Sequence, residues 1–563
     1  MKKIFNSRAL ALILVLAMAV SLLTISASAT TISKVSIAEG EPVAIDWTQA
    51  GTTYTGTIVN SATLSSTVYS MPSSFTLWTE GEATFEAGTG ITVTAIGASA
   101  DETNYSYKVD VSGIASGSTA TLVVTISSGT YTVALPSATP ISAGGTKPTS
   151  VLSYAPLGQF ARGNGWGSIY SNYANVAGST ASDALVKFAT GTGYESTGVS
   201  LGAFGGYIDF YFQGGITNDA KNPYGVDFVI YGNAFNANPE AGAVQVSEDG
   251  ITWYELAGSM YYDGNFNYTG EAGASRISNA YTGTLRNATI SYSQDSVIKA
   301  TVKDASGATK INAAQFVAST AWWPTVLKGY PAIAAHINSN ATSTSNVQVT
   351  CNDTVFSSTG VTLIPDSNTT ADYAFGYADV TPNGSPASYG DAINPYTPYT
   401  SSKTGGDGFD LEWAVDITTG LPVDVTGKTF RYVRVYSAVL DNGTFGETST
   451  EICGIFTTAN KATTSVNRTA APTSLKIGDD EIDNLADLGM IEKDNENYGG
   501  VVYYDASSLG LSSSTITVSA SSNANVYINS NTTGSYEKTS DVNVVRVIVQ
   551  EGTSAPYIAI IKF

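Results

Sequence analysis

The sequence predicts an all-β protein built from several β-sandwich domains. Short runs in which apolar and polar residues alternate recur along the chain, as at Tyr207–Phe212 and Phe430–Val439. Gly, Asn and Asp residues, which favour turns, separate these runs. Apolar residues at helical spacing are scarce, and we expect short helices only at Ser182–Phe188 and Asn312–Trp322, inside insertions.

The first residues have the features of a secretory signal peptide, which we place at 1–29. Lys2, Lys3 and Arg8 precede the apolar run Ala9–Ile25, and Ala27–Ala29 has the small-residue pattern of a cleavage site. We therefore expect a secreted or cell-surface protein. No second apolar run of about 18 residues follows, so we expect no transmembrane segment in the mature chain.

Two linkers divide the rest of the chain. Leu135–Ser150 is rich in Pro and Gly, and Thr457–Ser474 is polar and contains Pro472. They predict an N-terminal β-sandwich at 30–146, a central jelly-roll-like domain at 150–462 and a C-terminal β-sandwich at 464–563.

Both flanking domains contain a pair of strand-like runs joined by a turn. Ala120–Ile126 is followed by Tyr131–Leu135, and Val544–Val549 is followed by Tyr557–Lys562. Each pair predicts a hairpin. The two domains resemble immunoglobulin-like or cadherin-like spacer modules of bacterial surface proteins.

The central domain contains the most informative stretch, Asp227–Leu256. It predicts three short strands, with a loop at Gly232–Asn238 and a tight turn at Ser247–Gly250. Its pattern V-x-x-S-x-D-G-x-x-W resembles the hairpin of discoidin-type jelly rolls, a family of surface-binding modules.

Further stretches of the central region resemble bacterial cell-surface proteins with a galactose-binding-like jelly roll. The resemblance implies surface display and binding of carbohydrate or another extracellular ligand: a glycan, a surface polymer or a small nutrient. A structural or adhesive component without a small-molecule ligand is the alternative. The matching stretches are Tyr154–Phe160, Ser200–Gly206, Asp227–Phe235, Trp322–Pro324, Gly405–Asp416 and Gly446–Ile452.

The charge and the His and Cys content exclude several kinds of partner and site. The formal net charge of −21 opposes binding to nucleic-acid phosphates, so we expect no nucleic-acid partner. His336 is the one histidine in the sequence, which excludes zinc sites made of several histidines, and no nucleophile motif surrounds it. Cys351 and Cys453 are compatible either with a disulfide or with two buried thiols.

Aromatic residues are the strongest candidates for ligand contacts. The chain has 33 tyrosines and 7 tryptophans, and aromatic rings with polar edges suit sugar faces. We expect a ligand near the clusters that fall in predicted loops at the rim of the sandwich, namely Tyr261, Tyr262, Trp322, Trp323, Tyr396 and Tyr399.

Acidic residues give two weaker hypotheses. On a strand, Asp410, Glu412 and Asp416 would share one face, and neighbouring same-face residues lie roughly 6.6–6.8 Å apart. That spacing is compatible with the acid–base pair Asp410 and Glu412 of a glycoside hydrolase, an alternative to our expectation that the protein is not an enzyme.

The second hypothesis is a calcium site, which the jelly-roll resemblance implies. Hard oxygen ligands are plentiful on the predicted loops, although no EF-hand loop is present. The candidate ligands are Asp249, Asp407, Asp410, Glu447 and Glu451.

Overall fold

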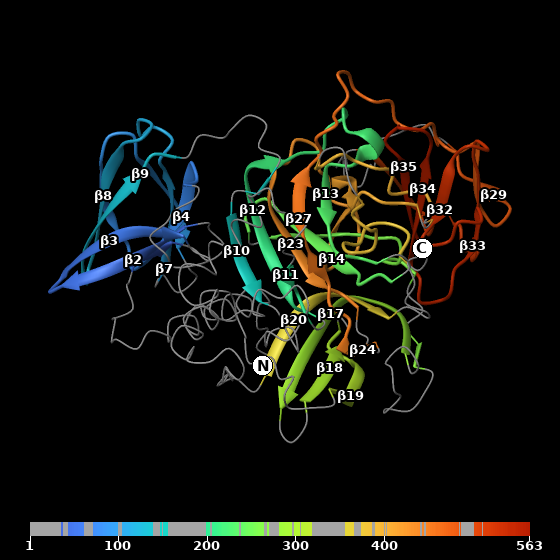
Figure 1. The fold of residues 1–563 in the computed structure, drawn as a ribbon, viewed down its shortest axis with the longest axis horizontal. Coiled ribbons are helices and arrows are strands. Elements are labelled where there is room, and N and C mark those ends of the chain that lie inside the picture. The colour runs from blue at the N-terminus through green and yellow to red at the C-terminus, as the bar shows by residue number, and fades with distance from the viewer. Residues whose placement is uncertain are drawn as a thin grey trace.

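The structure, a computed structural model, is an all-β sandwich protein, as predicted (Figure 1). Among the described residues, helical segments are two 3₁₀ turns, η3 (Pro223–Gly225) and η7 (Leu411–Trp413). The structure describes residues 35–37, 43–60, 71–98, 104–138, 147–148, 150–155, 199–202, 205–235, 238–250, 252–263, 267–268, 281–294, 298–303, 306–317, 355–364, 373–384, 389–398, 400, 402–439, 442–443, 446–483, 485, 500–508 and 510–563.

The N-terminal sandwich, blue in Figure 1, pairs two sheets of order β1-β4-β7-β6 and β2-β3-β9-β8-β5. The Trp47 indole donates to the Val35 carbonyl at 2.7 Å and links the two sheets, while Tyr54 stacks on Tyr131 in the core. The predicted hairpin is β8 with β9. The strands are β1 (Val35–Ile37), β2 (Val43–Ala50), β3 (Thr53–Asn60), β4 (Ser74–Glu80), β5 (Thr84–Ala87), β6 (Thr92–Ala98), β7 (Asn104–Asp110), β8 (Thr119–Ile126) and β9 (Gly129–Pro136).

The central domain packs a six-stranded sheet, β10-β12-β23-β14-β15-β22, and a three-stranded sheet, β21-β13-β27, around one apolar core. Two short pairs, β11 with β26 and β24 with β25, flank them. The strands are β10 (Ser150–Ala155), β11 (Val199–Ser200), β12 (Tyr207–Ile216), β13 (Phe228–Tyr231), β14 (Gly242–Ser247), β15 (Trp253–Leu256), β21 (Asp407–Phe409), β22 (Ala414–Asp416), β23 (Phe430–Ser437), β24 (Asn442–Gly443), β25 (Gly446–Glu447), β26 (Glu451–Ile452) and β27 (Gly454–Thr457).

The hairpin that the sequence predicts in the central domain is present as β14 and β15. Ser247 pairs with Trp253 at its end, and Gly250 in the turn has a φ of +75°, a conformation that glycine adopts without strain. The Asp249 carboxylate accepts from the backbone N–H of Thr252 at 2.7 Å and from the Ser247 hydroxyl.

A further sheet is inserted between β15 and β21, where the sequence predicts insertions. β17 pairs with β16, β18 and β20, and β18 pairs with β19. The helix expected at Asn312–Trp322 is wrong in its first part, because Asn312 lies within β19; Ser182–Phe188 lies outside the described residues. The strands are β16 (Asn267–Tyr268), β17 (Tyr281–Gln294), β18 (Ile298–Lys303), β19 (Thr309–Val317) and β20 (Val355–Ile364).

The C-terminal sandwich has sheets of order β29-β28-β31-β33 and β30-β35-β34-β32. Like the N-terminal sandwich, it pairs an early strand in parallel with its last strand: β30 with β35, as β3 with β9. The predicted hairpin is β34 with β35. The strands are β28 (Ser474–Ile477), β29 (Asp480–Glu481), β30 (Val501–Asp505), β31 (Thr515–Ser519), β32 (Asn525–Ile528), β33 (Ser535–Glu537), β34 (Val544–Gln550) and β35 (Tyr557–Lys562).

The C-terminal sandwich packs directly on the central domain. Side chains alternate along β34: Val545 and Val547 face the sandwich's own core, whereas Val544 and Ile548 belong to the core of the central domain. Between them, buried Arg546 donates to the backbone carbonyls of Ala257 and Gly258. One sheet is therefore buried on both faces, and the C-terminal sandwich contributes side chains to the core of the central domain.

Candidate acidic site

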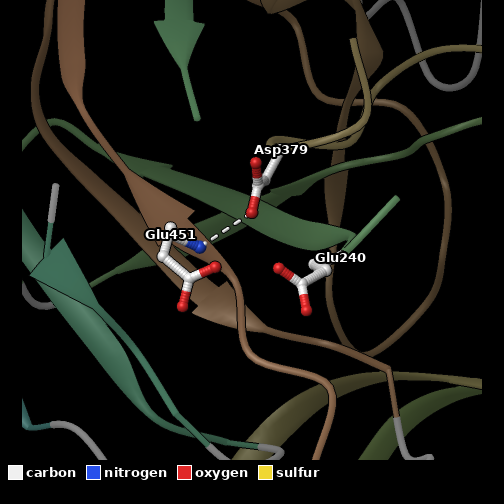
Figure 2. A group of neighbouring side chains, drawn as sticks. All are labelled: Glu240, Asp379 and Glu451. Carbon is white, nitrogen blue, oxygen red and sulfur yellow. Dashed lines mark hydrogen bonds between the residues drawn. The ribbon is translucent and has the colours of Figure 1, made fainter. Parts of the chain in front are cut away.

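Three carboxylates from distant parts of the chain meet in the central domain (Figure 2). Glu240 precedes β14, Asp379 lies in the segment 373–384, and Glu451 begins β26. One oxygen of each side chain lies within 4.8 Å of the others. Asp379 is fully buried, Glu451 is buried and Glu240 is partly exposed. We call these three residues the acidic triad.

Backbone groups hold Asp379 at the centre of the triad. Its carboxylate accepts from the backbone N–H of Asn233 at 2.7 Å and of Glu451 at 2.8 Å, and its carbonyl accepts from the N–H of Glu240. Asp379 itself has a φ of +61°, which side-chain-bearing residues rarely adopt. Gly232 provides the room, because a Cβ there would lie 2.1 Å from Asp379 Oδ1.

The triad has an excess of negative charge. Among the described residues, no Lys or Arg forms an ion pair with it. Burial, then the neighbouring Glu240 carboxylate, raises the pKa of Asp379 well above its usual value. Burial and the other two carboxylates likewise raise the pKa of Glu451, and burial raises that of Glu240. A bound cation or bound protons must offset this charge.

The calcium ligands predicted from the sequence do not come together. Of the five, only Glu451 belongs to the triad. Asp249 caps the hairpin turn, and Asp407 accepts from the backbone N–H groups of Val380 and Thr381.

Of the other two predicted ligands, Asp410 is not part of the triad, and the side chain of Glu447 lies outside the described part of the structure. Asp410 is the N-cap of η7, and Glu447 lies in β25. Asp249, Asp407 and Asp410 accept from backbone N–H groups and are not part of the acidic triad, so the prediction that these three share one calcium site with Glu451 is wrong.

The strand expected to carry Asp410, Glu412 and Asp416 on one face is also wrong. The chain leaves one sheet after β21, turns through η7 and enters the other sheet at β22. The Asp410 carboxylate accepts from the N–H of Glu412 at 2.8 Å, and buried Glu412 forms an ion pair with partly exposed Arg468. A glycosidase pair at Asp410 and Glu412 would need open access to substrate, and both residues are buried.

The tyrosines expected at the rim are buried. Tyr261, Tyr262 and Tyr396 are at most 2% exposed, and Tyr396 accepts from the Trp413 indole at 3.0 Å. They lie in turns, as predicted, but these turns pack beneath the C-terminal sandwich: Tyr527 donates to the Tyr396 carbonyl. Their rings are therefore not available for sugar stacking. Trp322, Trp323, Tyr399 and His336 lie outside the described residues.

Cys453 is a free, buried thiol, so the structure forms no disulfide with it. Burial raises its pKa to about 12. Cys351 lies outside the described residues.

No model of a known protein family and no curated protein matches this chain. Among the described residues, no helix has the length and apolar character needed to cross a membrane. Because neither a family model nor a curated protein matches, we infer the chemistry of the acidic triad from its geometry.

Proposed function

We propose that this chain is an exported, surface-displayed binding protein whose central domain is stabilised by a divalent cation of the calcium type at Glu240, Asp379 and Glu451. The observation that carries the proposal is the convergence of three carboxylates, two buried and one partly exposed, none of which forms an ion pair with a described Lys or Arg. Leaving three such charges uncompensated is unfavourable, and a divalent cation removes the repulsion.

The donor set fits calcium better than a transition metal. All three side chains offer hard oxygen atoms, and His and Cys ligands are absent from the triad. Calcium binds oxygen at about 2.3–2.6 Å, so two oxygens on one ion lie at most about 5 Å apart. The 4.8 Å limit within the triad agrees with that geometry.

The cation would organise the loop after β13. Asn233 in this loop donates to Asp379, and Phe235, two residues on, is 64% exposed. An exposed aromatic ring next to an ordered site is a contact that a carbohydrate or another extracellular ligand can use. The ligand class itself is inferred from the sequence resemblance, and a structural or adhesive role without a ligand is the second candidate.

The test of the cation is calorimetric titration of the full chain with calcium after removal of metal by chelator. We expect one site per chain, lost in Asp379→Asn and Glu451→Gln. Asp249→Asn is the matched control, because Asp249 is an acidic residue of the same domain outside the triad. Unchanged calcium binding in both triad variants would contradict the site.

The test of the ligand is a glycan-array screen of the same protein with calcium and with chelator. Specific binding that weakens in chelator, and in Phe235→Ala, would support carbohydrate recognition beside the cation. Absence of binding under both conditions would favour the structural or adhesive role.

A further inference from the structure

A second buried polar cluster lies where the central domain meets the C-terminal sandwich. Arg468, in the segment that leads into the sandwich, donates to both oxygens of Glu412 and to the carbonyl of Pro556 at 2.6 Å. Asp227, Asp410 and Asn222 complete the cluster, and all three are at most 2% exposed. The cluster therefore contains three carboxylates and one guanidinium.

The hydrogen bonds of Asp227 suit a carboxylate. One oxygen accepts from Asn222 Nδ2 at 2.7 Å and from the N–H of Asp219 at 3.2 Å, and the other accepts from the N–H of Leu411 at 2.9 Å. Both oxygens thus face N–H donors.

Asp410 differs from Asp227 in this respect. Its Oδ1 accepts from the N–H of Glu412, whereas its fully buried Oδ2 accepts no hydrogen bond from the described residues. The Oδ1 of Asn222, an acceptor, is the other buried oxygen of the cluster without a partner. An unpartnered, buried carboxylate oxygen is highly unfavourable, and a proton on it would turn the acceptor into a donor.

We propose that Asp410 is a neutral carboxylic acid, protonated on Oδ2, and that this proton stabilises the contact between the central domain and the C-terminal sandwich. Loss of the proton would add a buried negative charge to a cluster whose single positive charge, that of Arg468, already pairs with Glu412. The contact should therefore weaken as the pH rises.

The surrounding groups support this assignment. The titratable groups around Asp410 are Glu412, Asp227, Arg468 and the Tyr396 hydroxyl. Burial, then the charges of Glu412 and Asp227, raises the pKa of Asp410 well above its usual value, and the Glu412 N–H and Arg468 only partly oppose them. A raised pKa in the folded state contributes stability that is complete below the unfolded pKa, about 3.9, and is lost as the pH rises towards the folded value.

The experiment is urea unfolding of the full chain, wild type and Asp410→Asn, between pH 5 and pH 8. The asparagine can keep the Oδ1 acceptor and place an N–H where the acid has its O–H. We expect the equilibrium constant for unfolding of the wild type, divided by that of Asp410→Asn, to rise about tenfold per pH unit. Hydrogen exchange of residues 525–550, which include β32 and β34, should accelerate with pH beyond the chemical trend in the wild type but not in the variant.

Asp227→Asn is the matched control. Both oxygens of Asp227 accept from N–H groups, so the NH₂ group of an asparagine there would face donors and lose a hydrogen bond. We expect it to be destabilised throughout this pH range while retaining the steep pH dependence. A ratio for Asp410→Asn that does not change with pH would overturn the proposal. Loss of the pH dependence in Asp227→Asn instead would place the proton on Asp227 and overturn it equally.

Discussion

Gly232 determines whether Asp379 can occupy the centre of the acidic triad. A Cβ at Gly232 would overlap Asp379 Oδ1 at 2.1 Å, so Gly232→Ala must displace the carboxylate or the backbone. We expect a loss of about 1–3 kcal/mol of stability, as for overpacking in a core, together with weaker calcium binding. Thermal unfolding and calorimetric titration measure the two effects. Gly97→Ala is the control, because a Cβ there meets nothing within 4 Å; equal losses in both variants would contradict the steric argument.

Cys453 is expected to be chemically inert in the folded protein. With its pKa raised to about 12 by burial, the thiol has almost no thiolate at pH 8, and it is only 7% exposed. In a Cys351→Ser variant, Cys453 should react with a thiol reagent only after unfolding. Rapid reaction of the folded protein, followed by absorbance, would show that the thiol is accessible.

Among the structural elements, the β14–β15 hairpin depends on the Asp249 side chain. Asp249→Ala removes the acceptor for the Thr252 N–H and the Ser247 hydroxyl, so we expect a loss of about 1 kcal/mol in stability. Calcium binding should not change, because Asp249 lies outside the triad. Urea unfolding with and without calcium checks both statements, and a variant that loses its calcium response would restore Asp249 as a ligand.

How far the sequence predicts an element depends on how local its interactions are. The hairpins β8–β9, β14–β15 and β34–β35 are formed by neighbouring residues, and two strand-like runs joined by a turn are sufficient to predict them. The segment 407–416 also alternates, yet Asp410 caps η7 and moves the chain to the other sheet. An Asp side chain that accepts a hydrogen bond from the backbone N–H two residues later favours a turn over a strand. The alternation of apolar and polar residues does not reveal this preference.

At the scale of the whole molecule, the acidic triad could not be predicted from the sequence. Glu240, Asp379 and Glu451 are far apart in the chain, and no spacing motif relates them. Only Glu451 was among the predicted ligands, because acid content alone does not show which loops meet. The mostly apolar runs of β34 and β35 did contain a signal: a strand in which apolar and polar residues do not alternate is typically buried on both faces, as these are.

This burial leads to a prediction for how the molecule unfolds. The core of the central domain includes Val544, Ile548 and Ile558 from the C-terminal sandwich, whereas the described core of the N-terminal sandwich includes no residue of the other two domains. We therefore expect two calorimetric transitions, one for the N-terminal sandwich and one for the central and C-terminal domains together.

Arg546→Met tests this coupling. The substitution leaves the carbonyls of Ala257 and Gly258 without their buried donor, at a cost of about 3 kcal/mol, and removes a cation that lies 5.4 Å from the Tyr262 ring centre. The joint transition should move to lower temperature as one peak, with the N-terminal transition as an internal control. A third peak, from a C-terminal sandwich that unfolds alone, would mean that the shared core does not couple the two domains.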